Sequence, residues 1–176
     1  MADITYLNTV GRNPAAEAAA RSSSAVHCLL LPMGNRPVLL PNAAVAEIVA
    51  YNEPEALAGS PDWLLGMVTW RDRRVPLISF EVATGDTFAP PNAVSRIAVV
   101  NTLSGNQRLP YIGILTQAIP QLRLVNDDNT KPHEGAPTES SVAAVVEING
   151  EVVAVPDIDD LERRLERLQQ SSPGIA

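Results

Sequence analysis

The chain has 176 residues, of which 45% are hydrophobic and only 4% aromatic, which allows one domain with a mainly aliphatic core. Its formal charge of −7 argues against nucleic acid and anionic membrane surfaces as main partners. No apolar stretch of about 18 residues is present, and the sequence does not start with a basic-then-apolar signal pattern, so we expect a cytoplasmic protein without membrane insertion.

Residues 1–24 are expected to form a flexible N-terminal tail, because the alanine- and serine-rich part before residue 25 offers no apolar face to bury. The folded part then begins with an apolar run over 25–31. Gly34-Asn35 supplies a turn and 36–40 a second apolar run, which together predict a hairpin. After a proline break and one possible helical turn, a strand is expected over 47–51.

The stretch 66–80, GMVTWRDRRVPLISF, predicts a second hairpin with a charged tip. The residues before it, Ser60-Pro61-Asp62, have the order of a helix start, and Gly66 limits that helix to one turn. The tip, Arg71–Arg74, cannot be buried without a large desolvation cost, so it should face water. Two interpretations of the tip remain open. It is either a plain solvated turn or a protein contact, where arginine is over-represented.

The rest of the chain predicts short strands separated by turns, and one helix. The strands are expected over 95–103, 111–115, 121–125, 142–148 and 151–155. A long exposed loop is expected over 126–141, and Asn149-Gly150 fits a type I′ turn between the last two strands. Nine or ten short strands with one helix indicate an all-β protein, either one barrel or a pair of small barrels.

The last helix is expected to start after Asp157, because its apolar residues recur at spacings of three and four. These residues are Ile158, Leu161, Leu165 and Leu168. Aspartates in the first turn and arginines one turn later predict the pairs Asp159–Arg163 and Asp160–Arg164. We place the folded domain at 25–169 and a C-terminal tail at 170–176.

We expect no catalytic residue, metal site or cofactor. His27 lies in an apolar strand and His133 in a polar loop, which favours a core residue and a solvated residue over a metal pair. Cys28, the only cysteine, is expected to be a buried small hydrophobe rather than a reactive thiol. The aspartates at 127–128 and 157–160 fit a loop and a helix start better than a calcium or catalytic site. No Ser-His-Asp motif and no phosphate-binding glycine motif is recognisable.

From about residue 25 to 165 the pattern resembles the CheW-like adaptor domain of bacterial chemosensory arrays. VAEIV at 45–49 stands where the family has V-x-E-I. The stretch PDWLLGMVTWRDRRVPLISF matches the family pattern P-x-x-x-x-G-x-x-N-L-R-G-x-x-x-P-V-x-D-L at Pro61, Gly66, Arg71 and Pro76. The ending VAAVVEINGEVVAVPDIDDL is similar to the family's closing hairpin and helix.

The chain departs from this pattern at four positions. Thr69 and Trp70 replace Asn-Leu, Asp72 replaces a glycine, and Ser79 replaces an aspartate. The loss of the glycine is expected to change the turn, and Asp72 adds a carboxylate beside Arg71. These departures make the chain similar to the divergent CheW-like accessory proteins that control type IV pili and twitching motility.

The resemblance implies an all-β fold with a pair of intertwined five-stranded β-barrel subdomains and a C-terminal helix packed across them. It implies a non-catalytic adaptor that couples the cytoplasmic tip of a methyl-accepting chemoreceptor to the regulatory domain of a CheA-type histidine kinase at membrane-associated receptor arrays. The family's receptor-facing positions carry over to Val45, Glu47, Gly66 and Arg71.

Two other functions remain as alternatives. The first is a small-molecule or peptide sensor that binds its ligand between the two barrels, against which the charged tip and the low aromatic content both argue. The second is an enzyme, which ranks last because no nucleophile and base can be paired.

Overall fold

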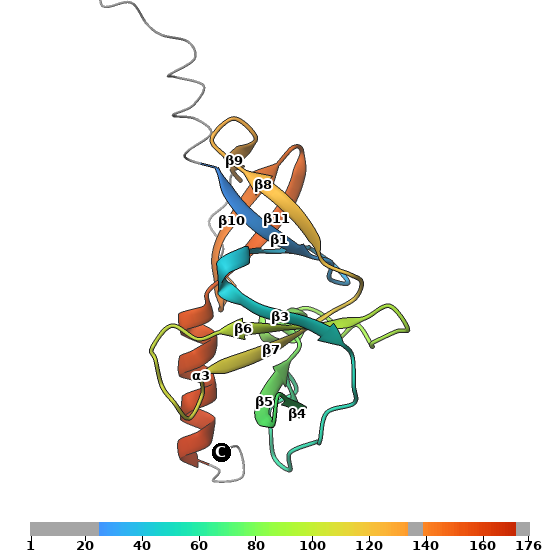
Figure 1. The fold of residues 1–176 in the computed structure, drawn as a ribbon, viewed down its shortest axis with the longest axis vertical. Helices are drawn as coiled ribbons and strands as arrows, with labels where there is room; N and C mark the ends of the chain where they lie inside the picture. Colours follow the sequence, from blue (N-terminus) through green and yellow to red (C-terminus); the bar gives the residue numbers. More distant parts are fainter. Residues whose placement is uncertain (1–24, 134–138, 172–176) are drawn as a thin grey trace, which may run out of the picture.

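The computed structural model describes residues 25–133 and 139–171, which form two β-sheets and one long helix (Figure 1). The strands are β1 (Val26–Leu31), β2 (Val38–Pro41), β3 (Val45–Ala50), β4 (Leu64–Trp70), β5 (Arg73–Ile78), β6 (Arg96–Asn101), β7 (Tyr111–Thr116), β8 (Gln121–Val125), β9 (Thr130–Pro132), β10 (Val142–Ile148) and β11 (Glu151–Pro156). The helices are the 3-10 turn η1 (Asn42–Ala44), the short α2 (Phe80–Ala83) and the long α3 (Ile158–Ser171). The tail expected over 1–24 lies outside the described residues.

Along the sequence, the strands of one sheet are inserted between the strands of the other. The terminal sheet has the order β8-β1-β2-β11-β10-β9, and the inserted sheet, made of β3 to β7, has the order β3-β6-β7-β5-β4. Most neighbours are antiparallel, but β2 pairs with β11 and β5 with β7 in parallel. The all-β class with a C-terminal helix is confirmed. The terminal sheet has six strands rather than the expected five.

The sixth strand, β9, lies within the segment that was expected to be a loop over 126–141. Its register places Pro132 opposite Val146 and Thr130 opposite Ile148. Sequence alone did not indicate this strand because it is an edge of three residues with exposed, mainly polar side chains, and such edges need no apolar alternation. The Asn149-Gly150 turn is as expected, with positive φ at both residues.

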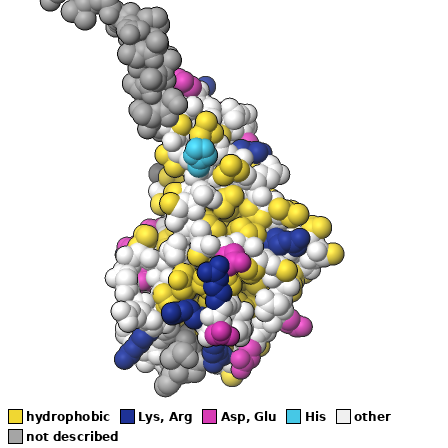
Figure 2. Space-filling view, viewed as in Figure 1, with side chains coloured by type: hydrophobic (Ala, Val, Ile, Leu, Met, Phe, Trp, Pro, Cys, Tyr) yellow, Lys and Arg dark blue, Asp and Glu magenta, His cyan; other side chains and the backbone are white. Residues whose placement is uncertain are grey.

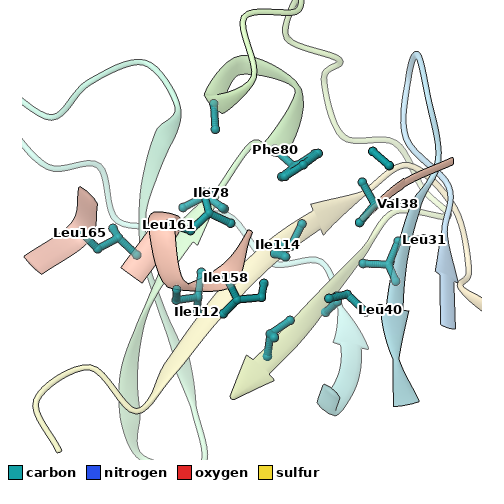
Figure 3. Close-up of a cluster of buried hydrophobic side chains, with 14 of the residues drawn as sticks. Leu31, Val38, Leu40, Ile78, Phe80, Ile112, Ile114, Ile158, Leu161 and Leu165 are labelled. Carbon is teal, nitrogen blue, oxygen red and sulfur yellow. The ribbon is translucent and has the colours of Figure 1, made fainter. Parts of the chain in front are cut away.

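Alternation along the strands divides the buried side chains into three clusters. The central core lies between the two sheets and α3, and Figure 3 shows its side chains converging from both sheets and the helix. The inserted sheet encloses a second cluster on its other face, which includes Val68, Trp70 and Val99. The terminal sheet encloses a third, which includes Cys28 and Val153. Each sheet therefore has one face in a shared core and one face in a core of its own.

Helix α3 fits the prediction in its cap and its apolar stripe. The Asp157 carboxylate accepts a hydrogen bond from the Asp160 amide at 2.9 Å, and three of the four stripe residues are buried. The helix extends to Ser171, two residues beyond the expected boundary. None of the helices in the described part of the chain is both long and apolar enough to span a membrane.

One of the two predicted helix ion pairs is wrong. Arg163 pairs with Asp159 as expected. Asp160 instead accepts a hydrogen bond from the Ser141 hydroxyl at 2.7 Å, and Arg164 donates to the same hydroxyl and lies 4.5 Å from the Trp63 ring centroid. Both side chains contact the buried Ser141, so tertiary contacts replace the exposed pair that helix spacing alone favours.

The helix predicted to start at Ser60 is absent. The residues form a turn in which the Ser60 hydroxyl donates to the Leu57 carbonyl at 2.9 Å, and β4 already starts at Leu64. A short helix, α2, forms further along instead. Ser79 caps it by accepting a hydrogen bond from the Val82 amide at 3.3 Å. Serine is a strong cap, so Ser79 is suited to the start of this helix.

His27 was expected in the core and is exposed on β1, because its side chain points to the face opposite that of Cys28. His133 is exposed as expected. Cys28 is buried, and burial raises the pKa of its thiol. The prediction of a small buried hydrophobe is therefore confirmed for this cysteine.

Candidate functional site

The hairpin between β4 and β5 carries its charged tip on a two-residue turn. Arg71 and Asp72 have φ values of 47° and 61°, and positive φ at both central positions is the geometry of a type I′ turn. Asp72 thus takes a left-handed conformation that glycine adopts without strain. The Arg71 side chain is 69% exposed, so the tip faces water as expected.

Glu47 and Arg71, two of the residues nominated from sequence, are in direct contact. Arg71 Nη2 lies 2.9 Å from Glu47 Oε2, and the same oxygen accepts a hydrogen bond from Trp70 Nε1 at 2.9 Å. The Arg71 guanidinium also lies over the Trp70 ring, 4.9 Å from the centroid. Because Arg71 is largely exposed, the ion pair adds at most about 1 kcal/mol, and its main effect is to orient the guanidinium.

Packing between two aromatic rings supports the Arg71 guanidinium. Trp70 is buried and meets Tyr111 of β7 edge-on, with ring centroids 4.8 Å apart and an interplanar angle of 72°. We call Glu47, Trp70, Arg71 and Tyr111 the Trp70–Arg71 cluster. It joins β3 to β4, the two edge strands of the inserted sheet, and so helps to curl that sheet.

Val45, the third nominated residue, lies on the opposite face of β3 from Glu47. A β-bulge shifts the register between them, so that Val45 is opposite Val100 and Glu47 is opposite Val99. Val45 is partly buried against the central core, whereas Glu47 reaches the Trp70 side. The structure therefore separates two residues that simple alternation would place on one face.

Gly66, the fourth, is buried on β4 beneath the segment that follows β3. Its φ is 140°, and a Cβ atom built there would lie 2.3 Å from the Glu55 carbonyl oxygen. Glu55 and Met67 exchange two backbone hydrogen bonds at this point, of 2.8 and 2.9 Å. Gly66 thus allows residue 55 to lie directly on β4, where the Glu55 side chain pairs with Arg74 at 3.0 Å.

Sequence reasoning did not find the roles of Trp70, Tyr111 and Glu55. One signal was available for Trp70, which is two residues after Val68 and therefore shares its buried face. Tyr111 reaches the site through the pairing of β7 in the inserted sheet, and Glu55 through an isolated bridge to Met67, for both of which a single sequence gives no signal. Nearby, burial and then the negative charge of Glu53 raise the pKa of Tyr51, so this phenol stays neutral.

The site brings an exposed ion pair and a buried indole together at the edge of the inserted sheet. Figure 2 shows acidic and basic side chains next to each other on the face of the molecule that it displays. Within residues 25–133 and 139–171, no group of three histidine, cysteine or acidic side chains could hold a metal ion. An open hollow of about 310 Å³ lies between Gly34-Asn35 and residues 86–89, but its Asn35 and Asp86 side chains hydrogen-bond to each other at 3.2 Å.

Comparisons with known proteins agree with this fold. The sequence model of the CheW-like domain matches residues 27–166. The crystal structure of the scaffolding protein TtCheW from Thermoanaerobacter tengcongensis is similar with a TM-score of 0.63 at 15% identity, covering 74% of this chain and 88% of that chain. No curated protein sequence matches the chain. Since the family match spans most of the sequence and the solved scaffold has the same fold, the chain belongs to the CheW-like domain family.

Proposed function

We propose that the chain is a non-catalytic adaptor in a bacterial chemosensory system, which couples the cytoplasmic tip of a methyl-accepting chemoreceptor to the regulatory domain of a CheA-type histidine kinase. Its membership of the CheW-like family supports an adaptor role. The observation that carries the proposal is the Trp70–Arg71 cluster, where an exposed guanidinium is fixed by a carboxylate and an aromatic ring. Exposed arginine is typical of protein-contact hot spots, and here the buried Trp70 ring supports it.

Of the four nominated residues, Glu47 and Arg71 are the ones we propose to face the receptor. A receptor tip is helical, and the polar face of an amphipathic helix would meet an exposed cation and its paired carboxylate. Gly66 and Val45 would act indirectly, because the first supports the packing of residue 55 on β4 and the second contacts the central core. We place the adaptor in the cytoplasm, recruited to receptor arrays.

The test is a binding titration of the purified chain against a receptor cytoplasmic fragment and, separately, against the kinase regulatory domain. Arg71→Glu would place a carboxylate beside Glu47 and should weaken receptor binding about tenfold or more, a change of about 1.4 kcal/mol. Kinase binding should stay unchanged, and the free energy of unfolding should fall by no more than about 1 kcal/mol, because the ion pair at the tip is exposed. Arg108→Glu, at an exposed arginine on the β6–β7 loop, makes the same charge change and serves as the control. Equal receptor affinity of the two variants would contradict the proposal.

We further propose that the pathway controls type IV pili, on the basis of the divergence at Trp70, Asp72 and Ser79. Deletion of the coding sequence should then reduce twitching and leave swimming intact. The converse phenotype would assign the adaptor to flagellar control instead. We rank the sensing alternative second, because the polar groups of the hollow at residues 34–35 and 86–89 already bind each other.

A further inference from the structure

Strand β8 is an edge of the terminal sheet and pairs with β1 alone in the described part of the chain (Figure 1). Edge strands are normally protected by charge, by proline or by a covering segment, because their unpaired backbone groups can pair with another strand. β8 reads QLRLV, with one charge and no proline within it. Its Leu122 and Leu124 residues are 59% and 49% exposed. This edge therefore lacks the usual protection.

The strand pairing determines which backbone groups of β8 point away from the sheet. The Ala154 amide donates to the Pro37 carbonyl at 2.9 Å, and Ala154 lies opposite Val38 in the parallel pair of β11 with β2. In such a pair the opposite residue directs its own amide and carbonyl to the other side, so Val38 faces β1, where it lies opposite Leu31. Backbone direction alternates along a strand, so the backbone groups of Leu31 and Leu29 point to β2 and not to β8.

Two leucines of β8 carry the outward-pointing backbone groups. Leu122 lies opposite Leu29, and Leu124 lies opposite His27, in the pairing of β8 with β1. Because neither of these β1 residues directs its backbone to β8, the amides and carbonyls of Leu122 and Leu124 point away from the sheet. One contact agrees with this direction, since the Leu124 carbonyl accepts a hydrogen bond from Asn129 Nδ2 at 2.8 Å. The outward groups left for another strand are both groups of Leu122 and the Leu124 amide.

These groups match a second copy of the same edge in one antiparallel register. With Leu122 opposite the Leu122 of the second copy, each Leu122 amide meets the other's carbonyl, and each Leu124 amide meets a Pro120 carbonyl. The two positions that this register leaves unmatched are Pro120, which has no amide proton, and the Leu124 carbonyl, which Asn129 already occupies. The register therefore uses every outward group that β8 has free.

Side chains favour the same register. Directly opposite residues share a face, so Leu122 packs on its own copy and Leu124 on Pro120, which makes one face apolar. On the other face Gln121 lies opposite Arg123, and these two side chains already hydrogen-bond within the chain at 2.7 Å. A register centred on Arg123 would instead place two like charges opposite each other, and one centred on Leu124 would need its occupied carbonyl.

We propose that two copies of the chain associate through their β8 edges, antiparallel and centred on Leu122, and so join their six-stranded terminal sheets into one continuous sheet. Two five-residue edges bury less than the roughly 1,200 Å² of the smaller stable interfaces, so the dimer is weak and forms at high micromolar concentration. Each chain carries a formal charge of −7, so salt strengthens the association by screening the repulsion. This interaction does not depend on the adaptor function.

Sedimentation equilibrium of the full chain, from low micromolar to millimolar concentration, measures the association. The expected result is a shift from monomer to dimer that is more complete at higher salt. Leu122→Lys places two like charges opposite each other and should weaken dimerisation about tenfold or more. The matched control is Leu103→Lys, the same exchange at a residue that is 67% exposed on the β6–β7 loop, which should leave dimerisation unchanged. A chain that stays monomeric throughout, or equal weakening by both variants, would overturn the proposal.

Cross-linking tests the register. Leu122→Cys and Leu124→Cys are compared with a thiol cross-linker that spans a single strand pair. Residue 122 lies opposite its own copy, about 5.5 Å away between Cα atoms, whereas residue 124 is displaced from its own copy by four residues, or about 14 Å along the strand. Cys28 should not react, because it is buried and burial raises the pKa of its thiol. Cross-linked dimer from Leu122→Cys alone is the expected result, and any other pattern of yields would overturn the proposal.

Discussion

The substitution Gly66→Ala tests whether this glycine is needed for backbone packing rather than for partner contact. Its matched control is Gly85→Ala. Both glycines have positive φ, of 140° and 95°, so alanine is strained at either position. A Cβ at Gly85 meets nothing within 4 Å, whereas a Cβ at Gly66 would lie 2.3 Å from the Glu55 carbonyl oxygen.

The expected magnitudes follow from these two environments. A left-handed conformation costs a non-glycine residue about 1–2 kcal/mol, and both variants should lose this amount. At Gly66 residue 55 must also move off β4, which breaks its two backbone hydrogen bonds with Met67. At about 1 kcal/mol each, these raise the cost of Gly66→Ala to about 3–4 kcal/mol.

Thermal unfolding followed by circular dichroism measures the difference. For a chain of this size each kcal/mol corresponds to about 2–4 °C in Tm, so Gly66→Ala should melt about 4–8 °C below Gly85→Ala. Urea unfolding should give the same order of stability. If the two variants melt together, the close approach of residue 55 does not constrain Gly66, and a direct contact with a partner becomes the better explanation for a glycine there.

Three further predictions concern other parts of the structure. Asp72→Gly should raise the free energy of unfolding by about 0.5–1 kcal/mol in urea, because glycine relieves the left-handed strain at some entropic cost; a fall would contradict this. Glu162→Ala should speed hydrogen exchange at the amides of Leu103 and Ser104, because these amides donate hydrogen bonds to the buried carboxylate at 2.9 and 3.1 Å. Unchanged exchange would show that the loop does not need this carboxylate to stay ordered. Burial raises the pKa of the Cys28 thiol above its ordinary value near 9, so the folded state holds this proton more tightly than the unfolded state. This contribution to stability is present below pH 9 and lost as pH rises further, and native thiol labelling should be slow; rapid labelling at neutral pH would refute it.

Much of the fold could be predicted from local chemistry. Asn149-Gly150 specifies its own turn, and the apolar spacing in α3 identifies the face that packs on the sheets. β9 and α2 were missed because three or four residues are too few to show a period. The order of the strands could not be predicted, since β2 finds its parallel partner β11 more than a hundred residues later.

The candidate site was predictable only in its parts. Charge placed Arg71 at an exposed tip, and the family pattern nominated Glu47. Their contact depends on the curl of the inserted sheet, for which a single sequence gives no signal. The bulge that turns Val45 away from Glu47 depends on the pairing of β3 with β6. The Trp70 indole that donates to the Glu47 carboxylate comes from β4, at the opposite edge of the curled sheet. Pairing and curvature, rather than residue type, decide which nominated residues meet.

The nesting of one sheet within the other sets an order of events during synthesis. The β1–β2 hairpin leaves the ribosome first, but β8, its neighbour on one side, begins 80 residues after Pro41, at Gln121. At about 5–20 residues per second, this delay is about 4–16 s. The inserted sheet can form in the meantime, while the leucines of the hairpin stay exposed until β8 and β11 pair with it. The nascent chain should therefore present β1–β2 to chaperones until β8 and β11 have been synthesised.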